Sequence, residues 1–293
     1  MNLDILTPIV QNRLNTLFEF YFKEKTYPSK TLQEAMAYST CTTGKLLRPL
    51  LVYLIAKTFQ APWEAADVPA LAIEMIHSFS LIHDDLPAMD NATLRRGKPC
   101  CHSVYGEAMA ILAGDALPML AIEIITDHPA PLTIEQRLKM IRVLSQATGS
   151  AGMTGGQALD ITPITANEDS ILELYRLKTG ALITACVKLG LIAAHQDHTA
   201  AEKSLIPAAE KIALAFQIQD DLMDLNPSEE LSGKNVGIDQ KNDKMTYALL
   251  VGKDKATFKV RELWQDAFSA LHPLDVNTDL LKAFLNKLID RSK

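Results

Sequence analysis

The sequence contains few cysteines. Among its 293 residues there are four, at positions 41, 100, 101 and 186. No two of them form a C-x-x-C pair, and a bridge between the adjacent Cys100 and Cys101 would be strained. The sequence therefore favours a reduced, cytoplasmic protein over a disulfide-stapled secreted one.

Positive charge is also scarce. The 29 lysines and arginines are outnumbered by 35 aspartates and glutamates, which gives a net charge of −6 and a pI near 5.7. Nucleic-acid backbones and anionic membranes demand a basic surface, so neither is an expected partner. An anionic ligand would have to meet local positive charge or a metal ion.

Long clean hydrophobic runs are absent. The most apolar segments, 109–125 and 180–194, are short or interrupted by charged residues or proline. Neither reaches the roughly 20 clean residues that a membrane-spanning helix needs, so no integral membrane segment is expected. The first residues carry Asp4 and Pro8 and lack a basic stretch followed by an apolar one, so we expect no signal peptide.

Apolar residues recur at three- and four-residue spacing along most of the chain, and alternation of the strand type is scarce. This pattern predicts an all-α protein, a bundle of about ten or more helices around a central cavity. No linker, composition break or repeat divides the sequence, so residues 1–293 are predicted to form a single domain. The helices are expected over 3–24, 31–41, 45–60, 65–86, 104–126, 134–152, 168–194, 200–225, 242–251, 254–271 and 277–290.

Segment 205–225 is an apolar helix with one acidic stripe. Gln217, Asp220, Asp221 and Asp224 fall at i, i+3, i+4 and i+7, so they share one face. A solvated surface face is the commoner fate of charged residues. Three carboxylates without a lysine or arginine among them repel one another, however, and a divalent cation would turn that cost into affinity.

Segment 70–90 is a second apolar helix that delivers acids at its end. Asp84 and Asp85 precede Pro87, which should terminate the helix. Asp90 follows six residues after Asp84, so the chain must bend at Pro87 to bring the three carboxylates together. Alone, this group is as compatible with an exposed acidic helix end as with a metal site.

Together the two clusters predict a diphosphate site. Hard carboxylate oxygens suit Mg²⁺, which is usually held by one or two carboxylates and by substrate phosphates. Two facing clusters could clamp one diphosphate through shared ions. Such a site needs no Gly-rich phosphate loop, and the sequence contains no G-x-x-x-x-G-K-[ST] run.

The two clusters, DDLPAMD at 84–90 and DDLMD at 220–224, resemble the two aspartate-rich motifs of the trans-prenyltransferase family, the polyprenyl diphosphate synthases. Further motifs occur in the family's order and cover most of the chain. They are TGKLLRP (43–49), EMIHSFSLIHDD (74–85), LRRGKP (94–99), ILAGDAL (111–117), GGQALD (155–160), KTGAL (178–182), FQIQDD (216–221) and the GK…GID…K-x-TY run (233–247). Within the family the bacterial farnesyl diphosphate synthases are most similar.

The resemblance implies condensation of isopentenyl diphosphate with dimethylallyl or geranyl diphosphate to farnesyl diphosphate. It implies Mg²⁺ as cofactor, three ions with substrate bound and Mn²⁺ as a substitute, and it implies a homodimer. The metal ligands would be the motif aspartates Asp84, Asp85, Asp90, Asp220, Asp221 and Asp224.

The same resemblance assigns the cationic residues. Arg95, Lys178 and Lys244 would bind the allylic diphosphate, with Lys234 assisting. The pocket for isopentenyl diphosphate would comprise Lys45, Arg48, His77 and Arg96. Without the surrounding motifs, each lone cation would be read as a surface side chain.

The implied reaction is an electrophilic alkylation. Metal ions and cations stabilise the charge that accumulates on the departing diphosphate, so the allylic C–O bond can ionise. The catalytic residues implied are Asp84, Asp220, Lys178, Thr179 and Gln217, the last three because their oxygens can face the carbocation. The isopentenyl double bond then attacks and a proton leaves.

Product length is open to a geometric argument. One helical turn rises about 5.4 Å, comparable to one isoprene unit. A bulky residue one turn before Asp84 would therefore form the closed end of the prenyl pocket. Phe79 and Ser80 lie there. An ordinary core role for Phe79 competes with this reading, yet the family's habit of placing an aromatic residue here favours fifteen carbons.

Several alternatives stay open. A geranyl or geranylgeranyl diphosphate synthase differs only in product length, and a terpene cyclase would not need the isopentenyl pocket. The His83–Asp84 pair suggests a metal-dependent phosphohydrolase, without further histidines at useful spacing to support it. Thr43, Leu46 and Ala248 depart from the family's pattern and bear on rate and affinity more than on reaction type.

Overall fold

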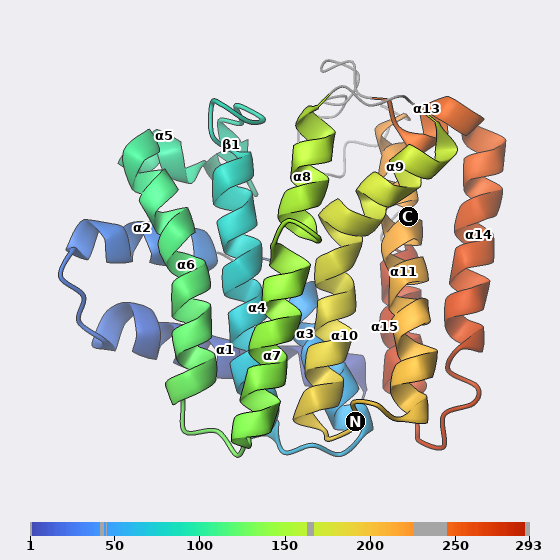
Figure 1. Cartoon of the computed structure of the whole chain (residues 1–293), viewed down its shortest axis with the longest axis horizontal. Helices are drawn as coiled ribbons and strands as arrows, with labels where there is room; N and C mark the ends of the chain where they lie inside the picture. Colours follow the sequence, from blue (N-terminus) through green and yellow to red (C-terminus); the bar gives the residue numbers. More distant parts are fainter. Residues whose placement is uncertain (1, 42–43, 45, 163–166, 226–244, 291–293) are drawn as a thin grey trace.

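The apolar periodicity of the sequence produces helices that pack side by side in one bundle (Figure 1). The computed structural model describes residues 2–41, 44, 46–162, 167–225 and 245–290. Over these residues the helices dominate, and the all-α prediction is confirmed. The single-domain organisation and the central cavity stay predictions.

Most helices begin and end close to the positions predicted, and the exceptions lie in segments 104–126 and 134–152. Their bounds are α1 Leu3–Glu19, α2 Lys30–Thr40, α3 Leu47–Thr58, α4 Trp63–Asp84, α5 Cys101–Tyr105, α6 Glu107–Asp127, α7 Ile134–Thr148, α8 Met153–Ile161, α9 Glu168–Tyr175, α10 Ala181–Ala193, α11 Ala200–Asp224, α13 Tyr247–Val251, α14 Lys253–Ser269 and α15 Asp279–Asp290. Two short π-helical turns are η1, Phe20–Glu24, and η2, Arg176–Gly180. The strands β1, Leu94–Arg95, and β2, Lys98–Pro99, form an antiparallel hairpin.

Helix α4 occupies the centre of the core. It packs against α3, α6 and α10, and it is buried on nearly every side between Ala65 and Ile76. A helix that is apolar all round is buried in a protein of this size. Because its neighbours cover its first four turns, only the C-terminal part of α4 can present polar groups to a ligand.

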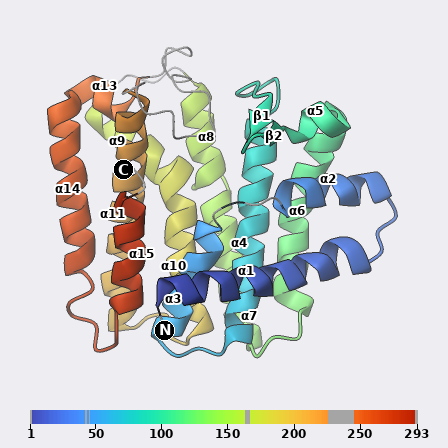
Figure 2. The ribbon, with the colours of Figure 1, turned by 180° about the vertical axis from the view of Figure 1, so that it is seen from behind.

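Helices α4 and α11 run in the same direction through the bundle. Each begins near the lower loops of Figure 1, and each ends at the edge where the β1–β2 hairpin and α8 lie. The reverse view in Figure 2 gives the same arrangement. The two aspartate motifs sit at the C-terminal ends of these helices, so both motifs lie at one end of the molecule.

Two predicted helices are wrong in extent. The single helix expected over 104–126 is divided at Gly106, whose φ of 84° lies outside the helical region, into α5 and α6. The helix expected over 134–152 ends at Thr148. The segment that follows forms α8, which was not predicted because its glycine pair, Gly155–Gly156, indicates a turn.

The segment 168–194 is helical as predicted but not uniform. It comprises α9, the π-helical turn η2 and α10. π-Bulges occur frequently at functional sites because they re-aim the residues beside them. Here the turn carries Lys178 and Thr179, two of the residues that the sequence singled out.

Two helices are long and apolar enough to cross a membrane by length and composition, and they differ in how far the protein covers them. In α4, 78% of the most apolar 18-residue window is buried, and in α6 44% is buried. Helix α4 is therefore a core helix. Helix α6 presents a large part of its apolar surface outward.

Candidate active site

The first aspartate motif closes the end of α4. Beyond Asp84 the chain turns back at Pro87, and the Asp90 amide donates a hydrogen bond to the Asp84 carbonyl at 2.9 Å. The bend that the sequence required is therefore present. It returns the backbone of Asp90 to the end of the helix.

Asp85 is held by the hairpin. Its side chain is buried, with 3% of the residue exposed, and Arg95 of β1 donates to both of its oxygens, from Nε at 2.8 Å and from Nη2 at 2.6 Å. A bidentate arginine–carboxylate pair fixes both partners in one orientation. The first motif is thus tied to the hairpin through the second member of its aspartate pair.

The second motif lies at the C-terminal end of α11. Asp220, Asp221 and Asp224 lie in the last two turns, and Gln217 precedes them on the same face. Asp221 is buried like Asp85 and accepts a hydrogen bond from the Tyr175 hydroxyl at 2.6 Å. The amide of Gln217 lies 3.4 Å from its other oxygen. Asp221 therefore anchors α11 to the end of α9.

A chain of polar contacts joins the two motifs through α8 and η2. On α8, Gln157 donates to the Asp84 carboxylate at 2.6 Å. One turn later on the same helix, Asp160 forms an ion pair with Lys178 at 2.6 Å. The Thr179 hydroxyl then donates to Gln217 at 3.0 Å, and Gln217 reaches the second motif. These contacts, together with the backbones of α8 and η2 that carry them, link the end of α4 to the end of α11.

Gly156 brings α8 into this position. A Cβ atom on Gly156 would lie 2.3 Å from the Lys178 backbone nitrogen. The helix can approach η2 this closely only because that residue has no side chain. The glycine pair that weakens the helical signal thus places Gln157 and Asp160 between the two motifs.

A second cluster of cations lies near the first motif. The guanidinium of Arg48, on α3, is 3.3 Å from Nε2 of His77 on α4. Arg96 occupies the hairpin turn with a φ of 54°, followed by Gly97 with a φ of 74°, as a type I′ turn requires. Its guanidinium covers Gly44, where a Cβ atom would lie 2.4 Å from Nη1. The hairpin therefore directs Arg95 to the first motif and Arg96 to the second cluster of cations.

Glu74 is the acid of this second cluster. It lies one turn before His77 on α4, and only 2% of it is exposed. Burial raises the pKa of Glu74 to about 7, while the charges of Arg48 and Arg96 act in the opposite direction. Burial also lowers the pKa of Arg48. The pocket thus combines two arginines with a carboxyl group that titrates near neutral pH.

Phe79 and Ser80 lie on α4 below the aspartates. The Phe79 ring meets the His83 ring edge-on, with centroids 5.1 Å apart, and packs against the core. The Ser80 hydroxyl donates to the His77 carbonyl at 2.8 Å. Phe79 is therefore a bulky side chain within two turns of the first aspartate motif, and its role in product length stays a prediction.

The acidic groups do not form a metal site in the arrangement described. Among the described residues, no three His, Cys, Asp or Glu side chains lie close enough together to hold an ion. Asp85 and Asp221 direct their oxygens at Arg95 and Tyr175 instead. Metal binding would need Asp84, Asp90, Asp220 and Asp224 to turn toward a shared ion.

Three predicted cations lie outside the described residues. They are Lys45, Lys234 and Lys244. Their proposed contacts with the two diphosphates stay predictions.

Sequence reasoning gave no role to several residues that the site contains. Gln157 and Asp160 were noted only as parts of the GGQALD motif, and Glu74 only as part of EMIHSFSLIHDD. Their three-residue spacing from other polar groups on a helix could have indicated them. Tyr175 gave no such signal, because its partner Asp221 is 46 residues away in the sequence.

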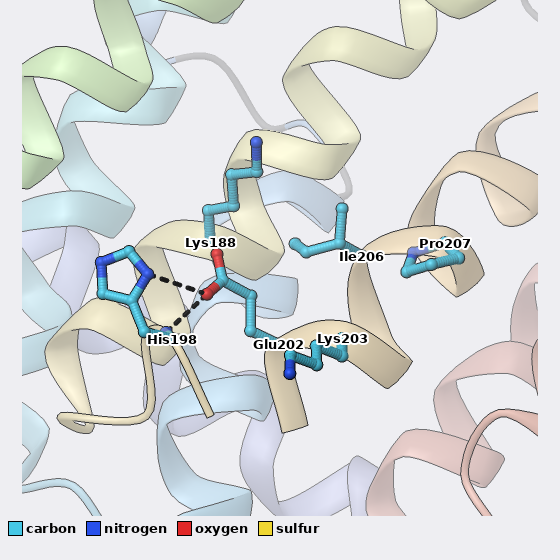
Figure 3. A pocket seen from close by; sticks show the side chains of 6 residues that line it. All are labelled: Lys188, His198, Glu202, Lys203, Ile206 and Pro207. Carbon is cyan, nitrogen blue, oxygen red and sulfur yellow. Dashed lines mark hydrogen bonds and ion pairs between the residues drawn. The ribbon is translucent and has the colours of Figure 1, made fainter. Parts of the chain in front are cut away.

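A surface cavity of about 530 Å³ lies elsewhere, where α10 joins α11 (Figure 3). Lys188, His198, Glu202 and Lys203 line it, and the carboxylate of Glu202 accepts a hydrogen bond from the His198 backbone. Glu202 and Asp220 are 18 residues apart on α11, which corresponds to about 27 Å at 1.5 Å per residue. The cavity contains none of the predicted site residues.

The fold and the cluster define a helical protein with two aspartate motifs at one end of its bundle. The sequence matches the polyprenyl synthetase family over residues 29–278, so the chain belongs to that family. The resemblance inferred from the motifs is confirmed.

Particular relatives show which members of the polyprenyl synthetase family the chain resembles. The chain is 44% identical to a farnesyl diphosphate synthase of Haemophilus influenzae, over 94% of this chain and 95% of that one. It is also 44% identical to a farnesyl diphosphate synthase of Escherichia coli, over 89% of each. Its fold is similar to the crystal structure of a geranyltransferase from Legionella pneumophila, with a TM-score of 0.87 and 33% identity over 99% of this chain and 98% of that one.

Proposed function

We propose that this protein condenses isopentenyl diphosphate with dimethylallyl diphosphate and then with geranyl diphosphate, forming farnesyl diphosphate. The observation that supports the proposal is a series of polar contacts between the ends of α4 and α11, in which Gln157 contacts Asp84, Asp160 contacts Lys178, and Thr179 contacts Gln217. That the two acidic motifs form one site is part of the proposal. The names and the near-complete coverage of the relatives support the same reaction.

The donor set fits a magnesium site. Asp84 and Asp90 lie at the end of α4, and Asp220 and Asp224 at the end of α11, so hard carboxylate oxygens come from two elements at one end of the bundle. When bound, Mg²⁺ neutralises charge on the diphosphate oxygens. Asp85 and Asp221 would support the ligands through their bonds to Arg95 and Tyr175. The number of ions, and Mn²⁺ as a substitute, stay predictions.

The cations of the site bind and orient the allylic diphosphate. Lys178 now pairs with Asp160, and a diphosphate oxygen would compete with that carboxylate for its ammonium group. Arg95 keeps its pair with Asp85 and presents the rest of its guanidinium to the site. Charge-assisted contacts of this kind are strong and directional. These residues stabilise the negative charge that the leaving group acquires.

The residues between the motifs face the carbocation. Thr179 and Gln217 share a hydrogen bond at 3.0 Å and lie where η2 meets α11. Their oxygens are suited to a positive centre because each carries a lone pair that protein hydrogen bonds do not exhaust. The π-helical turn sets the direction of both Lys178 and Thr179.

The second substrate would occupy the pocket of Arg48, His77 and Arg96. Two guanidinium groups from different elements converge there, and arginine forks match phosphate oxygens in pairs. Its double bond attacks the carbocation, and the released diphosphate is the candidate acceptor for the proton that leaves. A terpene cyclase has no use for such a pocket.

One incubation tests the proposal. The purified protein is supplied with Mg²⁺, dimethylallyl diphosphate and isopentenyl diphosphate, and the products are extracted and sized. A fifteen-carbon product is expected. A ten-carbon or twenty-carbon product alone would replace the farnesyl assignment, and phosphate release without condensation would favour the phosphohydrolase.

We also propose that the protein is a homodimer that joins through α6. Ile111, Leu112 and Met119 lie on one face of this helix and are 43%, 51% and 61% exposed. The adjacent Val104 on α5 is 46% exposed. The same face carries Asp115, whose side chain is 62% exposed, so it combines apolar residues with one charged group, and such a face is suited to a second copy of itself in an isologous contact. The surface charge and free thiols suit a cytoplasmic protein.

The homodimer is tested by mass in solution. Light scattering after gel filtration should give about twice the chain mass for the wild type and one chain mass for Met119→Lys. Phe258→Lys is the matched control, because Phe258 is 70% exposed but lies on α14. A monomeric wild type, or a Met119→Lys variant that stays dimeric, contradicts the assignment of the interface.

A further inference from the structure

The pocket of Arg48, His77 and Arg96 contains a buried acid that the reaction does not use. Glu74 is 2% exposed, lies one turn before His77 on α4, and is near enough to Arg48 and Arg96 for their charges to act on it. Among the described residues it has no hydrogen bond or ion pair, and the charges that act on it are those of Arg48 and Arg96. A buried carboxylate without a direct partner carries a cost of desolvation that protonation would remove.

The groups around Glu74 come from four elements. Arg48 lies on α3, Arg96 in the β1–β2 turn, His77 on α4 and Cys186 on α10. Burial raises the pKa of the Cys186 thiol to about 12, so that thiol stays neutral. The buried Nε of Arg48 has no hydrogen-bond partner among the described residues. Among the residues that the structure describes, the charged groups that act on Glu74 are therefore the two arginines.

A diphosphate that binds the two arginines changes the field at Glu74. The anion would satisfy the arginines and would add negative charge beside the two groups that act on Glu74. A like charge disfavours ionisation of a carboxyl group, so binding and protonation must favour each other. We infer that Glu74 is a positioning residue for the isopentenyl diphosphate pocket, which acts through Arg48 and Arg96 and takes up a proton when the diphosphate binds. This inference rests on the proposed function.

Two consequences can be measured. The burial that raises the pKa of Glu74 to about 7 leaves the group largely ionised at pH 8 in the empty pocket. A terminal phosphate, whose second pKa is about 6, is also ionised at that pH and has no proton to supply or accept. Binding should therefore draw up to one proton from solution. The affinity for isopentenyl diphosphate should fall by up to about tenfold per pH unit above pH 7.

The test is titration calorimetry at pH 8 in two buffers of different ionisation enthalpy. Isopentenyl diphosphate is added to the whole protein with Mg²⁺ and an allylic thiodiphosphate, whose C–S bond resists ionisation. The wild type should take up between about half a proton and one proton per site. Glu74→Gln, which keeps the shape and removes the titration, should take up none and should show little pH dependence of affinity.

Two further variants identify the group that takes up the proton. His77→Gln should keep the uptake, because the proton resides on Glu74. Asp67→Asn should keep it too, since Asp67 is a buried acid seven residues earlier on α4 that pairs with Arg13 outside the pocket. Equal uptake by the wild type and Glu74→Gln overturns the inference. The absence of proton uptake in the wild type also overturns the inference, and that result does not depend on the folding of any variant.

Failure of the proposed function gives a different result. A wild type that neither binds isopentenyl diphosphate nor forms a longer prenyl product fails as a prenyltransferase. A wild type that binds and condenses the substrate, but shows no proton uptake assigned to Glu74, fails this inference alone.

Discussion

Asp85 and Asp221 hold the same position in their motifs, and both are buried. Their partners differ, since Asp85 pairs with Arg95 and Asp221 accepts a hydrogen bond from Tyr175. The sequence predicted all six motif aspartates as metal ligands, and that role stays a prediction for each of them. The two partners come from a hairpin and from a helix that no local pattern relates to the motifs.

At the residue scale, we predict that a change at Phe79 alters the length of the product. Replacing Phe79 with alanine should open the space beside α4 and lengthen the product by at least one isoprene unit, since one turn of helix is about 5.4 Å. Chain length is measured by chromatography of the extracted products. Phe258→Ala, at an exposed phenylalanine on α14, should leave the product unchanged. An unchanged chain length for Phe79→Ala removes Phe79 as the floor of the pocket.

The ionisation of Glu74 predicts how the stability of the folded protein depends on pH. Because the pKa of Glu74 in the folded protein is raised to about 7 from 4.5, its contribution to stability is fully present below pH 4.5 and is lost as pH rises through 7. Stability measured by urea unfolding should therefore fall between pH 5 and pH 8 more steeply in the wild type than in Glu74→Gln. Parallel curves would show that Glu74 ionises in the folded protein as it does in the unfolded chain.

At the scale of elements, the long helices of the bundle, including the two that carry the aspartate motifs, followed from periodicity, and the elements that connect the two motifs did not. Helices α4 and α11 were predicted nearly to their ends because apolar residues recur along them. Helix α8 and the turn η2 were missed as separate elements. A glycine pair lowers helix propensity, and a π-helical turn has no pattern of its own, so tertiary packing decides both.

Gly156 tests how α8 is placed. Gly156→Ala would put a methyl group 2.3 Å from the Lys178 backbone, so α8 and η2 would have to separate. Overpacking of this kind should cost about 1–3 kcal/mol in the free energy of unfolding and should lower turnover. Gly180→Ala is the matched control, because its Cβ would meet Ala213 at an ordinary 3.5 Å and its φ is helical, −68°. Equal stability of the two variants would contradict the close approach of α8.

At the scale of the whole molecule, function depends on bringing distant segments to one end of the bundle. Asp84 and Asp220 are on helices that run in the same direction, and α8 and η2 fill the space between them. The motifs and their order predicted the family correctly. Tyr175 could not be predicted as a connecting residue, because its contact with Asp221 crosses the fold, whereas the three-residue spacing of Gln157 and Asp160 along α8 was an available signal.

The central claim is that Asp84 and Asp220 act together on one diphosphate. The measurement is the condensation rate of Asp84→Ala, Asp220→Ala and the double variant, with helical content checked by circular dichroism. Each single change should lower the rate at least about a hundredfold without loss of helix, and the double variant should be little worse than the slower single one. Asp254→Ala, at an exposed acid on α14, should retain full activity. Near-normal turnover of either single variant, or effects that multiply in the double variant, would contradict the claim.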